Sequence, residues 1–489
     1  MGGRRFLTAG AGGRRAMAAA LCVALARLGL GFCLATLLGP DPARAQAQAS
    51  EEPSGFWTRD TLLDDVGGLR SALDKVGGTL NLQEMSEVLG NVTGGIHRGA
   101  TYDGLTTMSL RLDTDKAFHW PGGTFNVSAL QIHGRSLSAN NLANLQTVSG
   151  IEADRATRLW ELWYQQALPS GKAEVKIGQQ SIDQEFIVSQ YAGLYLNTMM
   201  GWPMLPSADL YAGGPAYPLS SLGIRLETQW DGPLKLLGGV FDDNPPGGPF
   251  ANDPQGRDGE ASGTRFNLGT GALFIGELQY AVNPAAAADK SCDASSCALP
   301  GTYKLGIWYD TANFPDQRFD STGLSLANPA SSGMARQHNG NFSVYGVVDQ
   351  MIWREPGGPR SLGVFGRIMG APADRNLIDM SLNAGVNLKA PLPGRDDDTF
   401  GIGYGLAKVS GRAGALDQDR AAFTGTAYPV RSAEHFIEVT YQYQATPWWQ
   451  VQPDFQYVIN PGGGIQNPQN TTQRVGDEAV FGVRMNIVF

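Results

Sequence analysis

The sequence predicts an all-β protein: a transmembrane antiparallel β-barrel of about sixteen strands with short periplasmic turns, long extracellular loops and a short N-terminal helical segment. Segments of strand length alternate apolar and polar side chains, which gives each strand one apolar and one polar face. No stretch after residue 45 is apolar for the ~18 residues that a membrane-spanning helix needs. The connecting segments alternate between long and short, as in bacterial outer-membrane barrels.

The first 45 residues are predicted to be a secretory signal peptide. Four arginines precede an apolar run over residues 16–38, and the segment ends in the small-x-small cleavage site Ala43-Arg44-Ala45. A retained anchor helix is the alternative, although Arg27 interrupts the apolar run. Cleavage leaves 31 basic and 45 acidic residues, a net charge of −14. A chain this acidic, without a basic stripe, argues against nucleic-acid partners.

Residues 46–78 form the predicted periplasmic N-terminal segment, ahead of a barrel over residues 79–489. Between residues 56 and 78, apolar side chains recur at roughly helical spacing. They are Leu62, Leu63, Val66, Leu69, Leu73 and Val76. We expect one or two short amphipathic helices that pack on the barrel or enter it.

Sixteen strands are predicted from residue 79 onward, an even number as single-chain bacterial barrels require. Their ranges are 79–90, 102–113, 124–133, 157–168, 172–180, 222–230, 234–241, 264–280, 302–310, 341–353, 361–369, 377–389, 399–409, 433–444, 448–460 and 479–489. In the last one, Phe481, Val483 and Met485 share a face opposite Gly482, Arg484 and Asn486. The chain stops on an aromatic residue, Phe489, which is typical of such a membrane wall.

The lengths of the connections distinguish a membrane barrel from a soluble β-sandwich. Short connections such as 169–171, 231–233 and 445–447 contain Pro or Gly and suit tight turns. Long connections span roughly 134–156, 181–221, 242–263, 311–340, 410–432 and 461–478. This alternation places both termini in the periplasm. Two connections depart from it: residues 370–376 are short and residues 281–301 are long.

Two cysteines, Cys292 and Cys297, remain after the signal peptide is removed. Because the mature chain lies in an oxidising compartment, the C-x4-C spacing in a loop favours a disulfide. A metal site would need further ligands, and no nearby His or Cys supplies them. We therefore predict no metal site and no cofactor.

Several motifs resemble those of the carbohydrate-selective porins of Gram-negative outer membranes, the OprB family. They are LLDDVGGLR (62–70), WPGGTF (120–125), RLWELWYQQ (158–166), KIGQQSIDQEF (176–186), LPGTYKLGIWYDT (299–311) and QPDFQYVINPGGG (452–464). The resemblance covers about residues 56–489. It implies a sixteen-stranded outer-membrane barrel through which glucose and other small sugars diffuse passively. It also implies a pore narrowed by inward-folded loops that carry charged residues.

Polar and charged side chains on the inward strand faces are the candidate pore-lining groups, because they can hydrogen-bond sugar hydroxyls weakly enough for release. The candidates are Arg111, Arg135, Arg155, Arg158, Arg225, Glu227, Asp379, Glu438, Asp454 and Arg484. Arg225 with Glu227, and the three arginines around residues 134–156, are the stronger ones. For each candidate the alternative is a polar wall residue paired with its neighbour.

We predict no enzyme and no catalytic residue, because neither a His-Glu-x-x-His motif nor a Gly-x-Ser-x-Gly motif is present. One rival is a general or anion-selective porin, whose pore would be strongly cationic. Another is a secreted all-β glycosidase or sugar-binding protein. The expected partners are small sugars, outer-membrane lipids and the barrel-assembly machinery, with the chain a monomer or homotrimer.

Overall fold

The computed structural model describes residues 55–489, apart from 170, 231, 249–260 and 285–297. The predicted signal peptide, residues 1–45, lies outside the described residues, as do Cys292 and Cys297. Among the helices of the described part, none is long and apolar enough to cross a membrane.

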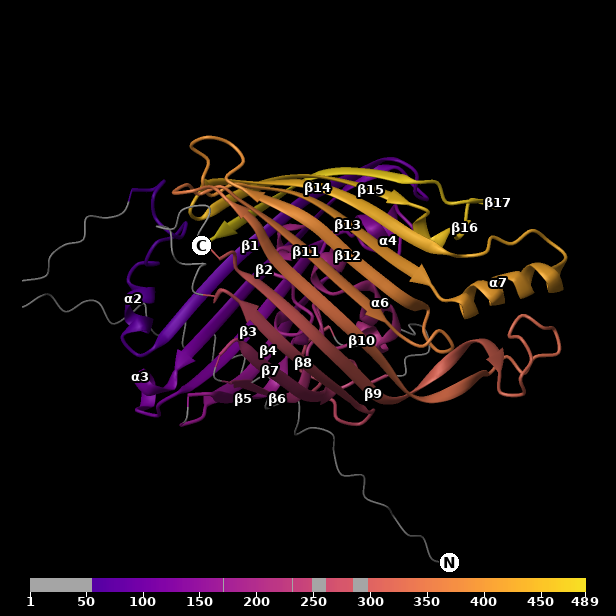
Figure 1. The fold of residues 1–489 in the computed structure, drawn as a ribbon, viewed down its shortest axis with the longest axis horizontal. Coiled ribbons are helices and arrows are strands. Elements are labelled where there is room, and N and C mark those ends of the chain that lie inside the picture. Colours follow the sequence, from indigo (N-terminus) through magenta and orange to yellow (C-terminus); the bar gives the residue numbers. More distant parts are fainter. Residues whose placement is uncertain (1–54, 170, 231, 249–260, 285–297) are drawn as a thin grey trace, which may run out of the picture. The chain divides into compact units, whose positions relative to one another are not determined.

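Sixteen antiparallel strands close into one barrel, as the sequence predicts (Figure 1). The ring closes where β1 pairs with β18, with Val88 opposite Val483. The strands are β1 (Gly78–Thr93), β2 (Gly99–Asp113), β3 (Gly123–Gly134), β4 (Ala156–Ala167), β5 (Ala173–Gln180), β6 (Ser221–Gln229), β7 (Leu234–Asp242), β8 (Ala272–Val282), β9 (Gly301–Asp320), β10 (Ala335–Arg354), β11 (Ser361–Gly370), β12 (Ile378–Lys389), β13 (Thr399–Val409), β14 (Ala433–Thr446), β15 (Trp449–Ile459) and β18 (Glu478–Val488).

Strand boundaries differ most from the prediction at β8, β9 and β10. β8 begins eight residues later than expected, and β9 and β10 extend beyond the expected ranges 302–310 and 341–353. The extra length forms a hairpin that projects beyond the barrel with the helix α7 (Gly411–Thr424) (Figure 1). Arg318 of β9 makes a bidentate ion pair with Asp419 of α7, with Nε–Oδ2 at 2.7 Å and Nη2–Oδ1 at 2.9 Å. This ion pair joins the hairpin to α7 beyond the apolar part of the wall.

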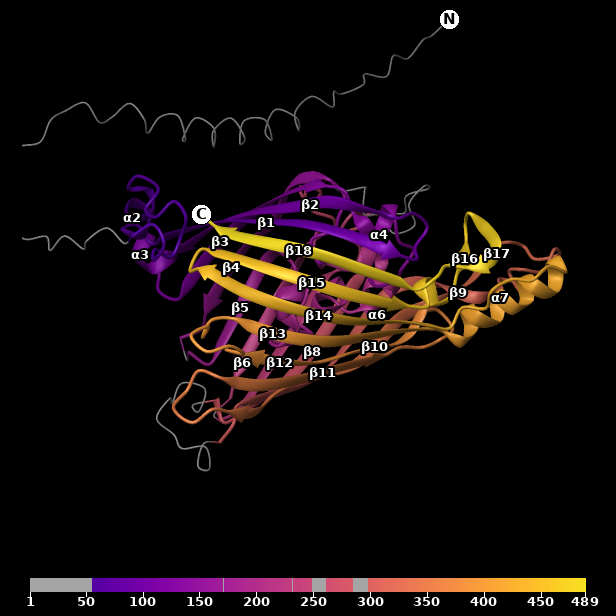
Figure 2. The ribbon, with the colours of Figure 1, turned by 90° about the horizontal axis from the view of Figure 1, so that it is seen from above.

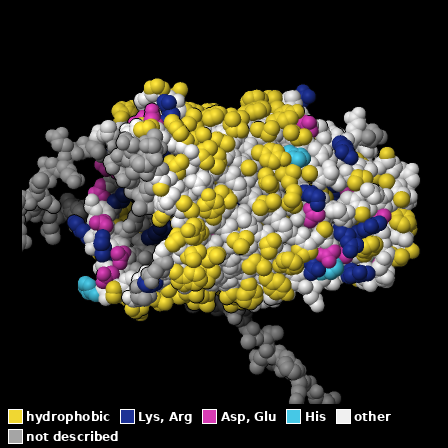
Figure 3. All heavy atoms as spheres, viewed as in Figure 1, with side chains coloured by type: hydrophobic (Ala, Val, Ile, Leu, Met, Phe, Trp, Pro, Cys, Tyr) yellow, Lys and Arg dark blue, Asp and Glu magenta, His cyan; other side chains and the backbone are white. Residues whose placement is uncertain are grey.

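Outward side chains of the wall are mostly apolar, whereas inward ones include the polar side chains and the apolar ones that pack against the inner loops. In β14, the side chain of Ile437 is 40% exposed, whereas those of its neighbours on the other face, Phe436 and Glu438, are fully buried. In β18, the alternate residues Phe481, Val483 and Met485 are each more than 40% exposed. Figure 3 shows hydrophobic side chains spread over the strand wall, with charged ones gathered toward its two ends. This is the surface that a wall facing lipid requires.

Over residues 55–78, the described part of the N-terminal segment, there is one short helix, α2 (Leu69–Asp74), where one or two helices over residues 56–78 were expected. Asp64, Val66, Gly67 and Gly68 all have positive φ, which a helix does not accommodate. The residues before α2 form turns instead. The segment is joined to the last strand by a hydrogen bond of 2.8 Å from the Leu62 N–H to the Val488 carbonyl.

Except for those between β1 and β2 and between β11 and β12, the short connections lie at the end of the barrel that carries α2 and α3 (Thr114–Phe118). Long connections lie at the other end, where α7 and a two-stranded hairpin of β16 (Gln466–Asn467) and β17 (Asn470–Arg474) are found (Figure 2). Two long connections turn back into the barrel. We call them the first inner loop (residues 135–155), with α4 (Leu137–Asn140), and the second inner loop (residues 181–220), with α5 (Thr198–Gly201) and α6 (Met204–Asp209).

The second inner loop supplies much of the hydrophobic core. Its Phe186, Tyr195 and Met200 pack in one cluster with wall residues that include Trp308 and Phe436. The remaining short turns of the loop are the 3-10 helices at Ile182–Gln184, Ala192–Leu194 and Tyr211–Gly213. One further 3-10 turn, Pro461–Gly463, follows β15. The core therefore sits inside the barrel, between the loop and one part of the wall.

Candidate pore-lining site

Buried carboxylates of the wall hold both inner loops in place. Each accepts a hydrogen bond from a loop backbone N–H: Glu277 from Ile187 at 2.8 Å, Asp349 from Gln190 at 3.0 Å, Glu438 from Asn197 at 3.2 Å and Glu434 from Gln146 at 2.7 Å. A buried carboxylate is tolerated only when its oxygens are hydrogen-bonded. The wall charges therefore fix the path of the loops through the lumen.

In the opposite direction, a carboxylate of the second inner loop accepts hydrogen bonds from backbone N–H groups at the wall. Asp209 of α6 accepts hydrogen bonds from the backbone N–H groups of Leu377, at 2.9 Å, and Ile378, at 3.2 Å. Burial raises the pKa of Asp209 well above its ordinary value, because the charged form loses its water. This contact ties α6 to the beginning of β12.

An inner chamber of about 530 Å³ lies on the short-turn side of the second inner loop. Its walls come from β2 to β8, near the strand ends that lead into short turns, and from Gln184 and Glu185 of the loop. Its charged lining residues are four cations and four anions: Arg111, Lys176, Arg225 and Lys235, with Glu161, Glu174, Glu185 and Glu227. The lining is thus balanced in charge.

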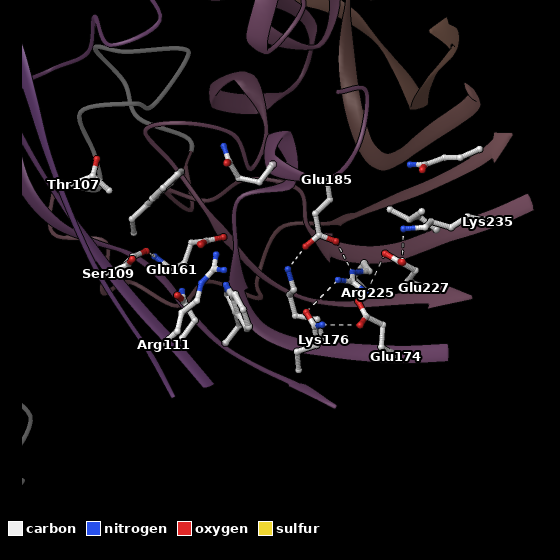
Figure 4. Close-up of a pocket in the computed structure, with 18 residues that line it drawn as sticks. Thr107, Ser109, Arg111, Glu161, Glu174, Lys176, Glu185, Arg225, Glu227 and Lys235 are labelled. Carbon is white, nitrogen blue, oxygen red and sulfur yellow. Dashed lines mark hydrogen bonds and ion pairs between the residues drawn. The ribbon is translucent and has the colours of Figure 1, made fainter. Parts of the chain in front are cut away.

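Arg225 is the centre of a network of ion pairs along this chamber (Figure 4). Its Nη1 lies 2.6 Å from Oε1 of Glu174, and its Nε lies 2.5 Å from Oε2 of Glu185. Glu185 also pairs with Lys176, and Glu227 pairs with Lys235 at 2.6 Å. Because Glu185 belongs to the loop, the same network that charges the chamber also holds the start of the loop against β5 and β6.

Aromatic rings complete the wall of the inner chamber. The Lys176 Nζ lies 4.4 Å from the ring centroid of Trp163, and the Arg111 guanidinium carbon lies 6.0 Å from it. Cations at this distance over an indole are attracted to its face. Trp160 also lines this chamber and contacts Tyr217 edge-on, with centroids 6.3 Å apart.

An outer chamber of about 560 Å³ lies on the long-loop side and is lined by both inner loops. Tyr217 lines it, so the Trp160–Tyr217 contact lies between the two chambers. The charged residues that line the outer chamber again balance in number: two anions, Glu152 and Asp154, and two cations, Arg155 and Arg158. Glu152 accepts hydrogen bonds from the backbone N–H groups of Leu137, at 2.8 Å, and Ser138, at 3.1 Å.

The sequence-predicted residues fall into two groups in the structure. Five line a chamber: Arg111, Arg225 and Glu227 the inner one, and Arg155 and Arg158 the outer one. The other five line neither: Arg135, Asp379, Glu438, Asp454 and Arg484.

Each of the five outside the chambers has a local partner. Arg135 is exposed and contacts Asn140 at 3.2 Å, and Asp379 pairs with Lys408 at 2.8 Å. Arg484 pairs with Glu87. Glu438 and Asp454 point inward as expected, but the second inner loop covers Glu438 completely and Asp454 is only 6% exposed. Glu438 accepts a hydrogen bond from the backbone N–H of Asn197 in the loop, and Asp454 accepts one from the side chain of Gln456 at 2.9 Å, so both have partners and their contact with solute stays a prediction.

Sequence patterns alone did not identify Glu185 as a chamber residue, because it lies in a loop without strand alternation. They also did not single out Arg367 of β11, which is 2% exposed inside the barrel. A signal existed at Arg367: it is the one charged residue in the strand segment SLGVFGRIMG. A single inward charge among apolar and glycine residues indicates a buried polar contact, because a buried charge needs hydrogen-bond partners.

Comparisons with known proteins agree with this architecture. The family model of the carbohydrate-selective porin, OprB family, matches residues 97–489. Porin B of Pseudomonas aeruginosa is 24% identical over 490 residues, which cover 95% of this chain and 96% of that protein. The high-pH structure of Pseudomonas putida OprB aligns with a TM-score of 0.74 at 22% identity, over 88% of this chain and 99% of that chain. At that identity, the structural likeness shows the fold.

Proposed function

The chain belongs to the carbohydrate-selective porins of the OprB family, and we propose that small neutral sugars such as glucose cross its lumen through the outer chamber, past the second inner loop, and then through the inner chamber. As a family member it is an outer-membrane channel for passive, carbohydrate-selective diffusion. The family and the barrel point to a channel rather than an enzyme. We propose further that it has no catalytic residue and needs no cofactor.

The balance of charge in both chambers is the observation that carries this proposal. The inner chamber has four cations and four anions, and the outer chamber has two of each. Opposite charges that are already paired offer an ion little stabilisation in exchange for its water. They still present donors and acceptors to a hydroxyl group. A balanced lumen therefore favours a neutral, hydroxyl-rich solute over an ion.

The same balance argues against the rival of an anion-selective porin, which would need an excess of cations at its narrow point. The chambers also suit release of the solute. Arg225 and Glu174 are engaged with each other, so a sugar hydroxyl competes with an existing ion pair and is bound weakly. Weak binding at several sites lets a solute enter and leave.

The partners beyond sugars are part of the proposal. The exposed apolar faces of β14 and β18 support contact with outer-membrane lipids. The closed barrel supports a partnership with the barrel-assembly machinery. We propose that the chain functions as a monomer or a homotrimer, since each barrel encloses its own pair of chambers.

Liposome swelling and planar-bilayer recordings test the proposal on the purified full-length mature protein. We expect glucose to enter faster than gluconate or glucosamine, because an electrostatic barrier of about 1 kcal/mol slows a charged solute roughly fivefold. We expect a reversal potential near zero in a KCl gradient. Liposomes without protein provide the baseline. Equal rates for neutral and charged sugars, with a strongly anion-selective reversal potential, would favour the general or anion-selective porin instead.

A further inference from the structure

Arg367 is a buried cation on the inner face of β11, and it lines neither of the two chambers described above. It is 2% exposed. Among the described residues, no carboxylate forms an ion pair with its guanidinium, and the carboxylate that acts on it electrostatically, Asp349, belongs to β10. A buried charge without an ionic partner is costly unless hydrogen bonds satisfy it fully. The groups that accept hydrogen bonds from Arg367 therefore indicate the role of its side chain.

Four backbone carbonyls of the second inner loop accept hydrogen bonds from this guanidinium. Nη1 donates to Ile187 at 2.9 Å and to Gly201 at 2.8 Å. Nη2 donates to Met199 at 2.6 Å and to Met200 at 3.0 Å. Three of these carbonyls belong to the last residues of α5, where a short helix leaves its carbonyls unpaired.

The amide of Asn383 orients the guanidinium for these contacts. Its Oδ1 on the neighbouring strand β12 accepts from Nε at 3.2 Å and from Nη2 at 3.0 Å. The planar guanidinium thus has a fixed direction, and each of its three nitrogens is engaged. A lysine at this position offers a single nitrogen and cannot reach two separate parts of the loop in the same way.

The carbonyls that Arg367 holds lie next to residues that shape the lumen. Met199 itself lines the outer chamber, together with Thr198 and Trp202. Ile187, at the other contact, follows Glu185 of the inner chamber by two residues. One side chain therefore fixes both the outer-chamber part and the inner-chamber part of the loop to the same place on the wall.

We propose that Arg367 is a positioning residue that sets the bore of the pore, by holding the second inner loop at Ile187 and at α5 against the wall at β11, so that this part of the loop does not move into the chambers. The inference rests on the proposed function only in taking the lumen as the path of the solute. Without the guanidinium, four carbonyls lose their donor inside the core. The loop then leaves the wall at β11 and moves toward the chambers, so the solute path narrows.

The test measures the bore directly. Arg367→Met, Arg367→Lys and wild type are reconstituted in planar bilayers, and polyethylene glycols of increasing size report the largest neutral polymer that enters. We expect Arg367→Met to lower the exclusion size and the single-channel conductance, the latter by about twofold since conductance follows pore cross-section. Arg367→Lys should lie between the two, because it keeps the charge but holds fewer carbonyls.

A matched control removes an arginine that does not touch the loop. Arg318→Met deletes an arginine of β9 whose bidentate partner is Asp419 of α7, outside the lumen. It should keep the wild-type exclusion size and conductance. Heat-modifiable migration on a gel shows which variants are folded before they are recorded.

A folded Arg367→Met barrel with a wild-type or larger exclusion size and conductance would overturn the proposal. If Arg367→Met does not fold, Asn383→Leu, which removes only the orienting amide, is recorded instead. A wild-type or larger bore in that folded variant would also overturn the proposal. Polymer exclusion reports the bore for any solute, so a wild-type channel that rejects glucose would contradict the proposed function and leave this measurement interpretable.

Discussion

Two glutamates on inward strand faces, Glu227 and Glu438, show how much a residue's role depends on what covers it. Glu227 lines the inner chamber, and its side chain is 21% exposed and paired with Lys235. Glu438 is fully buried and accepts hydrogen bonds from backbone N–H groups of the second inner loop. The same alternation of polar and apolar residues predicts an inward side chain for both. Only the first lines one of the two chambers.

Replacement of Arg225 tests the role of a single residue in the inner chamber. Arg225→Met removes one of the four cations of the inner chamber and leaves Glu174 and Glu185 without their shared partner. We expect the channel to become cation-selective, because the lining gains a net negative charge. We also expect glucose block of the current to weaken by a factor of about ten, the equivalent of about 1.4 kcal/mol. Reversal potentials and graded glucose block measure both effects.

Lys235→Met is the matched control for Arg225→Met. It makes the same change in chamber charge, but Lys235 pairs with Glu227 and not with the loop residue Glu185. It should shift the reversal potential in the same direction and leave the single-channel conductance steady. If the two variants behave alike in every respect, or if glucose block is unchanged in Arg225→Met, the role of Arg225 in the solute path is contradicted.

At the scale of elements, the N-terminal segment and the β14–β15 turn form an aromatic contact at the short-turn end. The ring of Trp448 stacks with those of Trp57, at 6.5 Å between centroids, and Trp449, at 6.1 Å. Its indole N–H donates to the Phe56 carbonyl at 3.1 Å. Together with the hydrogen bond from Leu62 to Val488, this contact ties the segment to the closing strands of the barrel.

Trp448→Ala should lower the free energy of unfolding by about 3 kcal/mol, because a buried tryptophan is lost and its cavity remains. Trp448 is only 6% exposed, whereas Trp57 is 64% exposed. Trp57→Ala is therefore the control, with an expected loss of about 1 kcal/mol from the ring contact alone. Urea unfolding in lipid vesicles, followed by gel migration, compares the two. Equal losses for both variants would contradict this account of the contact.

At the scale of the whole molecule, one closed ring of sixteen strands leaves no free sheet edge, because every barrel strand pairs on both sides. Closure is what lets a β-structure cross lipid, where an unpaired backbone group is costly. The inner loops then fill part of the lumen, and the inner chamber lies on the side of β2 to β8. A further cavity of about 910 Å³ lies on the other side of the second inner loop, next to Tyr191 and Asp349.

The intact protein should therefore fractionate with outer membranes and migrate faster on a gel before boiling than after it, since a closed barrel resists detergent at room temperature. Membrane fractionation and paired boiled and unboiled lanes measure this. The matched control is the same chain unfolded in urea before loading, which should run only at the slower position. Recovery as a soluble periplasmic protein without a mobility shift would favour the secreted all-β alternative.

The sequence by itself determined the barrel, its sixteen strands and the faces of most side chains, because alternation and connection length are local properties of the chain. Even so, it could not find the long β9–β10 hairpin or the turns before α2, where polar pairing and positive-φ residues override local pattern. Only the tertiary structure decided which inward groups meet the lumen. Arg225 and Arg367 both point inward from their strands and both contact the second inner loop, yet only Arg225 lines one of the two chambers. That difference depends on where a loop distant in sequence packs, and its packing is set by buried charges that pair only in the closed barrel.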